Sequence, residues 1–166
     1  MKTAWYSILI ILSLATGASA QQTVFVVRHA ERADTVAGAA PTMAADPELS
    51  EAGRARAESL ATVLKDAKVV AIFTTEFKRT QATAAPLAKA LGVQVTTIST
   101  SEPAKLLQAV KGAGGNVLVV GHSNTVPAIV KDLGVAAPVT VGDAEYDNLF
   151  VVTMGATPSA LRLHYR

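Results

Sequence analysis

Val24-Phe25-Val26-Val27-Arg28-His29 is the stretch of sequence that decides the fold, because an apolar run ends abruptly on an arginine and a histidine. A continuous apolar run of this length fits a strand that is covered on both faces. A second run, Asn116-Val117-Leu118-Val119-Val120-Gly121-His122, also ends on a histidine. In open parallel α/β sheets, ligands bind outside the carboxyl ends of the strands. The two runs therefore predict that His29 and His122 reach the same edge of one sheet.

The remaining chain alternates between helical patterns and short apolar runs. Ser50 is a favourable N-cap, and after it Ala57, Leu60, Ala61 and Leu64 recur at helical spacing. The last two strands are expected to form an antiparallel hairpin at a sheet edge. Alternating strands and helices predict a three-layer α/β/α sandwich with a mostly parallel sheet. Further helices are expected over residues 79–91, 103–111 and 125–133, and further strands over residues 69–75, 93–98, 149–153 and 160–164.

Length and charge limit the classes of function. The chain has 166 residues and a formal net charge of +2, and 50% of its residues are apolar. This length suffices for one domain with a sizeable core. A nucleic-acid interface needs Lys and Arg clustered on one face, and the nearly even charge balance gives no sign of one. We therefore expect one domain that does not bind nucleic acid.

The start of the chain has the pattern of a secretory signal peptide. Lys2 provides a positive charge, residues 5–15 form an apolar stretch, and Ala18-Ser19-Ala20 offers small residues for cleavage. The apolar stretch is shorter than the ~20 residues that a membrane span needs. The absence of cysteine excludes lipoprotein attachment and disulfides. We therefore expect a signal peptide over residues 1–20, a domain over residues 21–166, and a periplasmic or secreted protein without membrane contact after cleavage.

Arg28 and His29 are candidate functional residues because of their place at a strand end. A guanidinium is costly to bury alone and needs an anionic partner. Imidazole is a nucleophile at neutral pH. Arg79 opens a helix after another strand and brings a second guanidinium to the same edge. Two cations and two imidazoles around one pocket predict a site that handles an anion by nucleophilic chemistry.

The residues after His122 favour phosphate as that anion. Ser123 and Asn124 lie at the opening of the next helix. A helix N-terminus presents free N–H groups and a positive dipole end, which suits phosphate. We therefore expect Ser123 and Asn124 to join Arg28 and Arg79 in binding the substrate.

Four segments of the chain together resemble a known family. They are Arg28-His29-Ala30-Glu31, Leu49-Ser50-Glu51-Ala52-Gly53, Lys78-Arg79-Thr80-Gln81-Ala82-Thr83-Ala84 and Val120-Gly121-His122-Ser123-Asn124-Thr125. In this order they resemble the histidine phosphatase superfamily, which is also called phosphoglycerate mutase-like, and they span nearly the whole chain after the leader. The resemblance implies an α/β/α sandwich.

The resemblance also implies a mechanism. His29 attacks phosphorus and becomes a phosphohistidine, while Arg28, Arg79 and His122 hold the phosphoryl oxygens. General chemistry agrees, because phosphoryl transfer depends mostly on positioning and charge stabilisation, and arginines bind phosphoryl oxygens with paired N–H groups. No metal or other cofactor is expected, since side chains supply the cations. The expected partner is a small phosphorylated substrate or a phosphopeptide, held between loops over residues 33–48 and 139–148.

The residue that protonates the leaving group stays open at this point. A leaving alkoxide needs a proton, and a carboxylic acid is a common donor. Glu31 lies close to His29 in sequence and Glu102 follows the third strand, so these are the two candidate acids, with Glu76 and Asp147 as further options. If no acid is in place, phosphoramidates and aryl phosphates are the expected substrates, because their leaving groups are good.

Other functions can be built from the same residues. A binding protein can capture a phosphorylated ligand in this pocket without turnover. A phosphoglycerate mutase-type phosphotransferase is less favoured, because the short segment 98–103 lacks the large insertion of mutases. His29-Ala30-Glu31 has the HxE spacing of zinc deaminases, but the partner cysteines are absent, and Arg28 would repel a metal ion.

Overall fold

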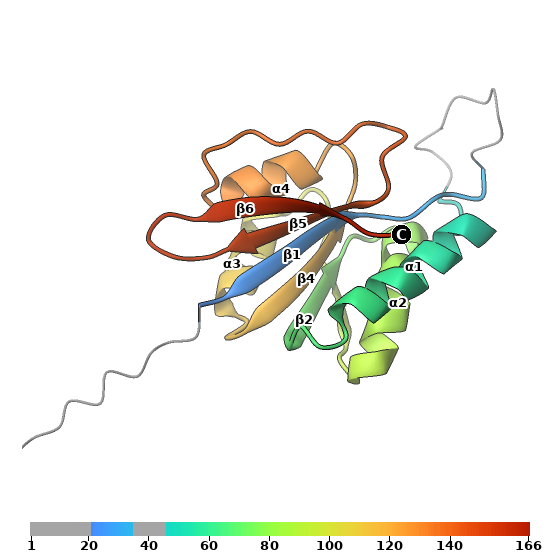
Figure 1. Cartoon of the computed structure of the whole chain (residues 1–166), viewed down its shortest axis with the longest axis horizontal. Coiled ribbons are helices and arrows are strands. Elements are labelled where there is room, and N and C mark those ends of the chain that lie inside the picture. The colour runs from blue at the N-terminus through green and yellow to red at the C-terminus, as the bar shows by residue number, and fades with distance from the viewer. Residues whose placement is uncertain (1–20, 35–45) are drawn as a thin grey trace, which may run out of the picture.

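The computed structural model describes residues 21–34 and 46–166. The expected signal peptide and most of the expected loop over residues 33–48 lie outside the described residues. The described chain forms one six-stranded sheet with helices on both faces (Figure 1). None of the described helices is long and apolar enough to span a membrane.

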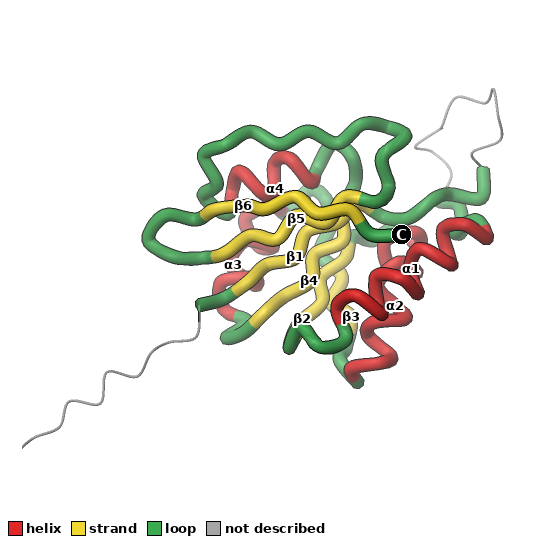
Figure 2. Tube along the Cα trace, viewed as in Figure 1, coloured by secondary structure: helices red, strands yellow, loops and turns green. Residues whose placement is uncertain are grey.

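The parallel part of the sheet brings the two histidine-bearing strands together. The strand order is β3-β2-β4-β1-β5-β6 (Figure 2). Parallel pairing joins β1 (Thr23–Arg28) to β4 (Asn116–Gly121), and then β4 to β2 (Val69–Thr74) and β2 to β3 (Val95–Thr97). Arg28 is the register partner of Gly121. The residues that follow these two, His29 and His122, therefore leave the sheet next to each other.

The antiparallel part closes the other side of the sheet. β5 (Asn148–Thr153) runs antiparallel to β1, and β6 (Ser159–His164) pairs antiparallel with β5 at the edge. The predicted edge hairpin is thus confirmed. The mostly parallel sheet is confirmed as well, because three of the five strand pairings are parallel and join β1, β4, β2 and β3.

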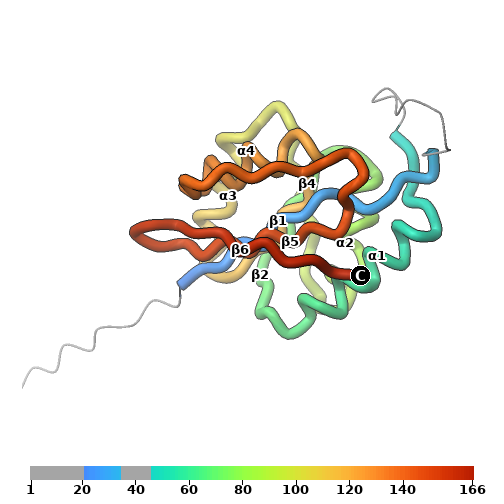
Figure 3. Tube along the Cα trace, turned by 45° about the horizontal axis from the view of Figure 1, so that its top comes forward, coloured from blue at the N-terminus to red at the C-terminus, as the bar shows by residue number. Residues whose placement is uncertain are grey.

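Two helices cover each face of the sheet, with α1 (Glu51–Leu64) and α2 (Lys78–Leu91) on one side and α3 (Pro103–Gly112) and α4 (Val126–Asp132) on the other (Figure 3). Side chains of β1 alternate between the two cores. Val24 and Val26 join the core under α3 and α4, and Phe25 and Val27 join the core under α1 and α2. The apolar run is continuous because both faces of β1 are buried, which confirms the three-layer sandwich.

The start of α1 is fixed to the segment that follows β1. Ser50 caps the helix as predicted, with its hydroxyl accepting from the N–H of Gly53 at 3.0 Å. The N–H of Ser50 donates to the carbonyl of Glu31 at 2.9 Å. A Cβ atom at Gly53 would overlap that same carbonyl. The helix therefore approaches the backbone two residues after His29 more closely than any side chain at Gly53 permits.

Candidate active site

His29 directly follows β1, and its side chain is buried. Its backbone N–H donates to the carbonyl of Gly121 at 2.9 Å and so ties the ends of β1 and β4 together. Its Nδ1 lies 2.8 Å from the carbonyl oxygen of Ala30. Because a carbonyl only accepts hydrogen bonds, Nδ1 carries the proton and Nε2 keeps a free lone pair. His29 is thus held in the tautomer that a nitrogen nucleophile needs.

His122 lies beside His29, as the sequence predicts. The two ring centroids are 5.3 Å apart in an edge-to-face arrangement. Nδ1 of His122 is 3.4 Å from Nη2 of Arg79, and it accepts there because a guanidinium only donates. The proton of His122 is therefore on Nε2, which donates to the hydroxyl of Thr75 at 3.0 Å. The two imidazoles face one another with opposite tautomers.

Burial keeps both imidazoles uncharged. Burial lowers the pKa of His29 to about 3, and the neighbouring His122 and Arg28 act in the same direction. Burial and then the charge of Arg79 lower the pKa of His122 to about 4, although Glu76 opposes this change. At neutral pH His29 is therefore a free base, and His122 is neutral until an anion joins it.

A chain of hydroxyl groups orients His122. Oγ1 of Thr80 donates to the carbonyl of Phe77 at 2.7 Å and lies 2.9 Å from Oγ1 of Thr75. Since Thr80 gives its proton to the carbonyl, it accepts from Thr75, and Thr75 in turn accepts from His122. The sequence analysis missed this role for Thr75 and Thr80. The available signal was a hydroxyl directly after the apolar run of β2 and another in the segment that contains Arg79.

Arg79 lies at the start of α2 and is fully buried, with 0% exposure. Its guanidinium lies 4.3 Å from the ring centroid of Phe77, and Nη1 is 3.5 Å from the carboxylate of Asp46. Among the described residues, Nε and Nη1 of Arg79 have no hydrogen-bond partner. Buried N–H groups without acceptors are costly. Arg79 is therefore prepared to bind an anionic ligand.

Arg28 is held by the loop before β5. Its Nη1 donates to three carbonyl groups of residues 142–145, at 2.9 to 3.3 Å. The guanidinium also stacks on Tyr146, 3.9 Å from the ring centroid. Nε of Arg28 is buried without a partner in the described part of the chain. Burial lowers the pKa of Arg28, while Tyr146 and Asp143 oppose the change.

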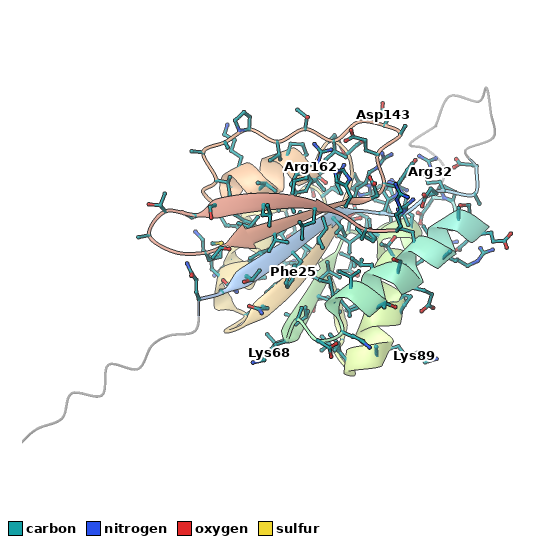
Figure 4. The ribbon with its side chains drawn as sticks, in the orientation of Figure 1. Phe25, Arg32, Lys68, Lys89, Asp143 and Arg162 are labelled. Atoms are coloured by element: carbon teal, nitrogen blue, oxygen red, sulfur yellow. The ribbon has the colours of Figure 1, made fainter. Side chains whose placement is uncertain are left out.

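Arg32 is a third buried cation near the site, and the sequence analysis missed it. Its guanidinium donates twice to the carboxylate of Asp34, at 2.8 and 2.5 Å. Besides burial, which is the main cause, the charge of Arg32 lowers the pKa values of Arg28, Arg79 and His122. Its side chain lies at the end of the molecule where β1 finishes (Figure 4). The available signal was its position three residues after His29.

The two predicted binding residues after His122 lie in different surroundings. The hydroxyl of Ser123 donates to the carboxylate of Asp143 at 3.3 Å, so Ser123 faces the loop before β5. Asn124 is exposed at the edge of a cavity of about 210 Å³ between α3 and α4. Within the described part of the chain, neither side chain forms a hydrogen bond with Arg28 or Arg79.

Both candidate acids are held by cations. Glu31 accepts three hydrogen bonds of 2.7 to 2.9 Å from Arg56 on α1. Glu102 is exposed and pairs with Lys105 at 3.1 Å in the first turn of α3. A carboxylate that is bound to a cation in this way is not free to contact a leaving group. These pairs argue against Glu31 and Glu102 as the general acid.

Glu76 and Asp147 are also held as carboxylates. Burial raises the pKa of Glu76, but hydrogen bonds from its own backbone, Thr100 and Ser99 outweigh burial and leave the pKa below its usual value. Burial likewise raises the pKa of Asp147, but the hydrogen bond from His164 at 3.1 Å, the charge of His164, a hydrogen bond from its own backbone and the charge of Arg56 together outweigh burial and leave the pKa below its usual value. Within residues 21–34 and 46–166, no three acidic or histidine side chains are grouped so that they can hold a metal ion.

Comparison with known proteins agrees with this geometry. Residues 24–100 match the family model of the histidine phosphatase superfamily (branch 1). No curated protein matches the sequence. A protein from Agrobacterium tumefaciens, provisionally assigned as the phosphohistidine phosphatase SixA, has a similar solved structure with 25% sequence identity and a TM-score of 0.59. The match covers 85% of this chain and 97% of that protein.

More distant structures share the fold. The protein histidine phosphatase SixA, solved with tungstate, has 18% identity and a TM-score of 0.65 over 86% of this chain and 96% of that one. An Escherichia coli protein, provisionally assigned as an α-ribazole-5′-phosphate phosphatase, has 14% identity and a TM-score of 0.68, again over 86% of this chain and 96% of that one. The match to the family model over residues 24–100, the fold and the paired histidines all agree with the resemblance of this chain to the histidine phosphatase superfamily.

Proposed function

We propose that this protein is an exported phosphatase that hydrolyses phosphate monoesters or phosphoramidates through a phosphohistidine on His29, without a metal ion. One observation carries the proposal. The buried ring of His29 lies 5.3 Å from that of His122, and two buried guanidinium groups adjoin this pair, Arg28 directly before His29 and Arg79 in contact with His122. Among the described residues, Nε of both arginines and Nη1 of Arg79 have no hydrogen-bond partner. The match of residues 24–100 to the superfamily model supports phosphatase activity, and the leader pattern of the sequence supports export.

His29 is the nucleophile of the proposed reaction. Its Nε2 attacks phosphorus, the bond between phosphorus and the leaving atom breaks, and the electron pair stays with that atom, which takes up a proton. Water then attacks the phosphohistidine, loses a proton, and the electron pair of the P–N bond returns to Nε2. Such a covalent intermediate divides one difficult displacement into two easier ones.

The arginines balance the charge of the phosphoryl group. The N–H groups of Arg28 and Arg79 that have no partner among the described residues are donors for phosphoryl oxygens. Charge stabilisation and positioning supply most of the catalysis in phosphoryl transfer. Because both groups are fixed by packing against aromatic rings before substrate arrives, little reorganisation is needed at the moment of reaction.

His122 gains a proton when the dianion binds. The pKa of His122 is about 4 mainly because burial disfavours its charged form. A phosphoryl dianion next to the ring favours the charged form and raises this pKa. His122 then donates to a phosphoryl oxygen while Thr75 continues to hold its Nε2–H.

The substrate class follows from the site and from the relatives. Two of the similar structures are described as SixA proteins, one as a phosphohistidine phosphatase and one as a protein histidine phosphatase. The short segment 98–103 leaves no room in the sequence for a mutase-type insertion. We therefore place this protein among enzymes that act on a small phosphorylated molecule or a phosphopeptide, with phosphoramidates as a class to test first.

Hydrolysis of p-nitrophenyl phosphate by His29→Ala tests the proposal. We expect turnover to fall by about 10³-fold or more, because the nucleophile is lost, and the acid-labile phosphoryl label on the protein to disappear. His164→Ala is the matched control, since His164 is exposed at the end of β6 and its side chain pairs with Asp147. Retained turnover in His29→Ala would refute the mechanism. A wild-type protein that binds phosphate without turnover would instead identify a binding protein.

A further inference from the structure

The proposed phosphatase needs a proton donor for its leaving group, and most carboxylates around the site are already bound by cations or by N–H and O–H donors. Glu31 is held by Arg56, and Asp34 by Arg32. Asp46 accepts from the backbone N–H of Lys78 and pairs with Arg79. Glu76 and Asp147 have the hydrogen bonds described above. Each of these carboxylates would lose a favourable contact on taking up a proton.

Asp143 differs from all of them in its contacts. Its carboxylate accepts one hydrogen bond, from the hydroxyl of Ser123 at 3.3 Å, and no cation pairs with it within the described part of the chain. A hydroxyl can accept as well as donate, so this contact survives protonation of the carboxyl group. The side chain is exposed, and solvent can therefore resupply its proton.

The loop before β5 attaches Asp143 to both halves of the site. Its backbone carbonyl accepts from Nη1 of Arg28 at 2.9 Å, and Arg28 precedes His29. Its side chain meets Ser123, which follows His122. Asp143 also lies close enough to the Arg28 guanidinium to raise the pKa of that group against the effect of burial. It is found at the same end of the molecule as Arg32 (Figure 4).

We infer that Asp143 is the general acid and base of the reaction, an inference that rests on the proposed phosphatase function. As Nε2 of His29 bonds to phosphorus and the bond to the leaving oxygen breaks, the carboxyl proton of Asp143 moves to that oxygen. The resulting carboxylate then takes a proton from the attacking water while the P–N bond breaks. The products are the free alcohol and inorganic phosphate, and His29 and Asp143 return to their starting forms.

A series of substrates with different leaving groups tests this role. In Asp143→Asn we expect kcat for phenyl phosphate and alkyl phosphates to fall by about 10²- to 10⁴-fold, which is the usual contribution of a general acid. For 2,4-dinitrophenyl phosphate we expect a fall of less than about 10-fold, because this leaving group needs no proton. The dependence of kcat on leaving-group pKa therefore becomes steeper in the variant.

Asp66→Asn is the matched control, because it makes the same change at an exposed residue in the turn after α1, and we expect it to leave the kinetics of every substrate unchanged. An equal fall for every substrate in Asp143→Asn would overturn the inference, since it would indicate only a displaced loop. Unchanged rates would overturn it too. Both results leave the proposed function in place as long as the wild type turns over and His29 carries the label. A wild type without turnover would refute the proposed function itself.

Discussion

At the scale of single residues, the orientation of His122 depends on one hydroxyl group. Thr75 accepts from Nε2 of His122 and so leaves Nδ1 as the acceptor for Arg79. Rotation of the ring by half a turn would place Cδ2–H against Arg79 and Cε1–H against Thr75, so both hydrogen bonds would be lost. Thr75 is thus a positioning residue for a group that the proposed reaction uses directly.

Thr75→Val removes this acceptor while keeping the shape of the side chain. We expect kcat to fall by about 10-fold with little change in KM, because a buried Nε2–H without an acceptor costs about 1–3 kcal/mol and lets the ring turn. Steady-state kinetics with p-nitrophenyl phosphate measures both constants. Thr75→Ser keeps the hydroxyl and should restore most of the rate.

Thr62→Val is the control for a lost threonine hydroxyl. Oγ1 of Thr62 bonds only to the carbonyl of Glu58 on the exposed side of α1, so we expect wild-type kinetics. If Thr75→Val also keeps the wild-type kcat, the role assigned to Thr75 is wrong.

Single residues also show why part of the site was predictable. His29 and His122 each follow a long apolar run, and this pattern alone places both at the carboxyl ends of buried strands. Arg32 and Asp143 belong to segments without such a pattern. Their positions depend on the isolated bridge between Arg32 and Leu49 and on the carbonyls that surround Arg28. These tertiary contacts produce no periodic pattern of apolar residues in the sequence.

At the scale of elements, α1 fixes the segment that carries the nucleophile. The N–H of its N-cap residue, Ser50, donates to the carbonyl of Glu31, and Gly53 in its first turn packs closely against the same carbonyl because it has no side chain. Further along the same helix, Arg56 binds the carboxylate of Glu31 and also donates to the carbonyl of Tyr165. The backbone after His29 is therefore clamped between a helix start and the end of the chain.

Gly53→Ala tests this clamp. Alanine in a helix is normally favoured over glycine by about 1 kcal/mol. Here the added Cβ overlaps a backbone carbonyl, and we expect the free energy of unfolding to fall by about 1–3 kcal/mol instead. The rate of p-nitrophenyl phosphate hydrolysis should fall as well, because the shifted carbonyl lies two residues from His29. Urea denaturation and steady-state kinetics measure the two effects.

Gly112→Ala provides the comparison at the end of α3. A Cβ atom at Gly112 meets nothing within 4 Å, and we expect unchanged or slightly higher stability. Equal stabilities of the Gly53→Ala and Gly112→Ala proteins would show that the start of α1 has room to move.

The ends of elements were harder to predict than their centres. Residues 93–98 look like one strand, but Val93 donates to the carbonyl of Ala88 to close α2, so β3 is only Val95–Thr97. Thr125 was expected in a helix. Its hydroxyl accepts from the N–H of His122 at 2.8 Å, which holds it in the turn before α4. In both places a capping contact outweighs the local hydrophobic pattern.

At the scale of the whole molecule, the sheet concentrates positive charge at one end. Three buried arginines and two buried histidines converge where β1 and β4 finish, although the whole chain carries a formal charge of only +2. Like charges in a buried site disfavour further protonation. The positive charges that favour binding of a phosphoryl dianion therefore also disfavour protonation of His29 and His122 in the folded protein.

The dependence of stability on pH tests this consequence. The pKa values of His29 and His122 are about 3 and about 4 in the folded protein, against 6.5 as the ordinary value. At pH values between the folded and the unfolded pKa of each histidine, the unfolded chain binds more protons than the folded one. The free energy of unfolding therefore falls as the pH falls below about 6.5. From pH 7 to pH 5 we expect a loss of about 2 kcal/mol for each histidine. Urea denaturation at the two pH values measures this loss.

His29→Gln and His122→Gln should each remove about half of the pH-dependent loss, because glutamine takes up no proton in this range. His164→Gln should leave most of the loss in place, since His164 is exposed and outside the cluster. The carboxylates with lowered pKa values destabilise the protein only at more acidic pH, so they do not obscure the comparison. A loss of equal size in all three variants would mean that the paired imidazoles are not the groups that exclude protons, and the free-base state of His29 would lose its physical basis.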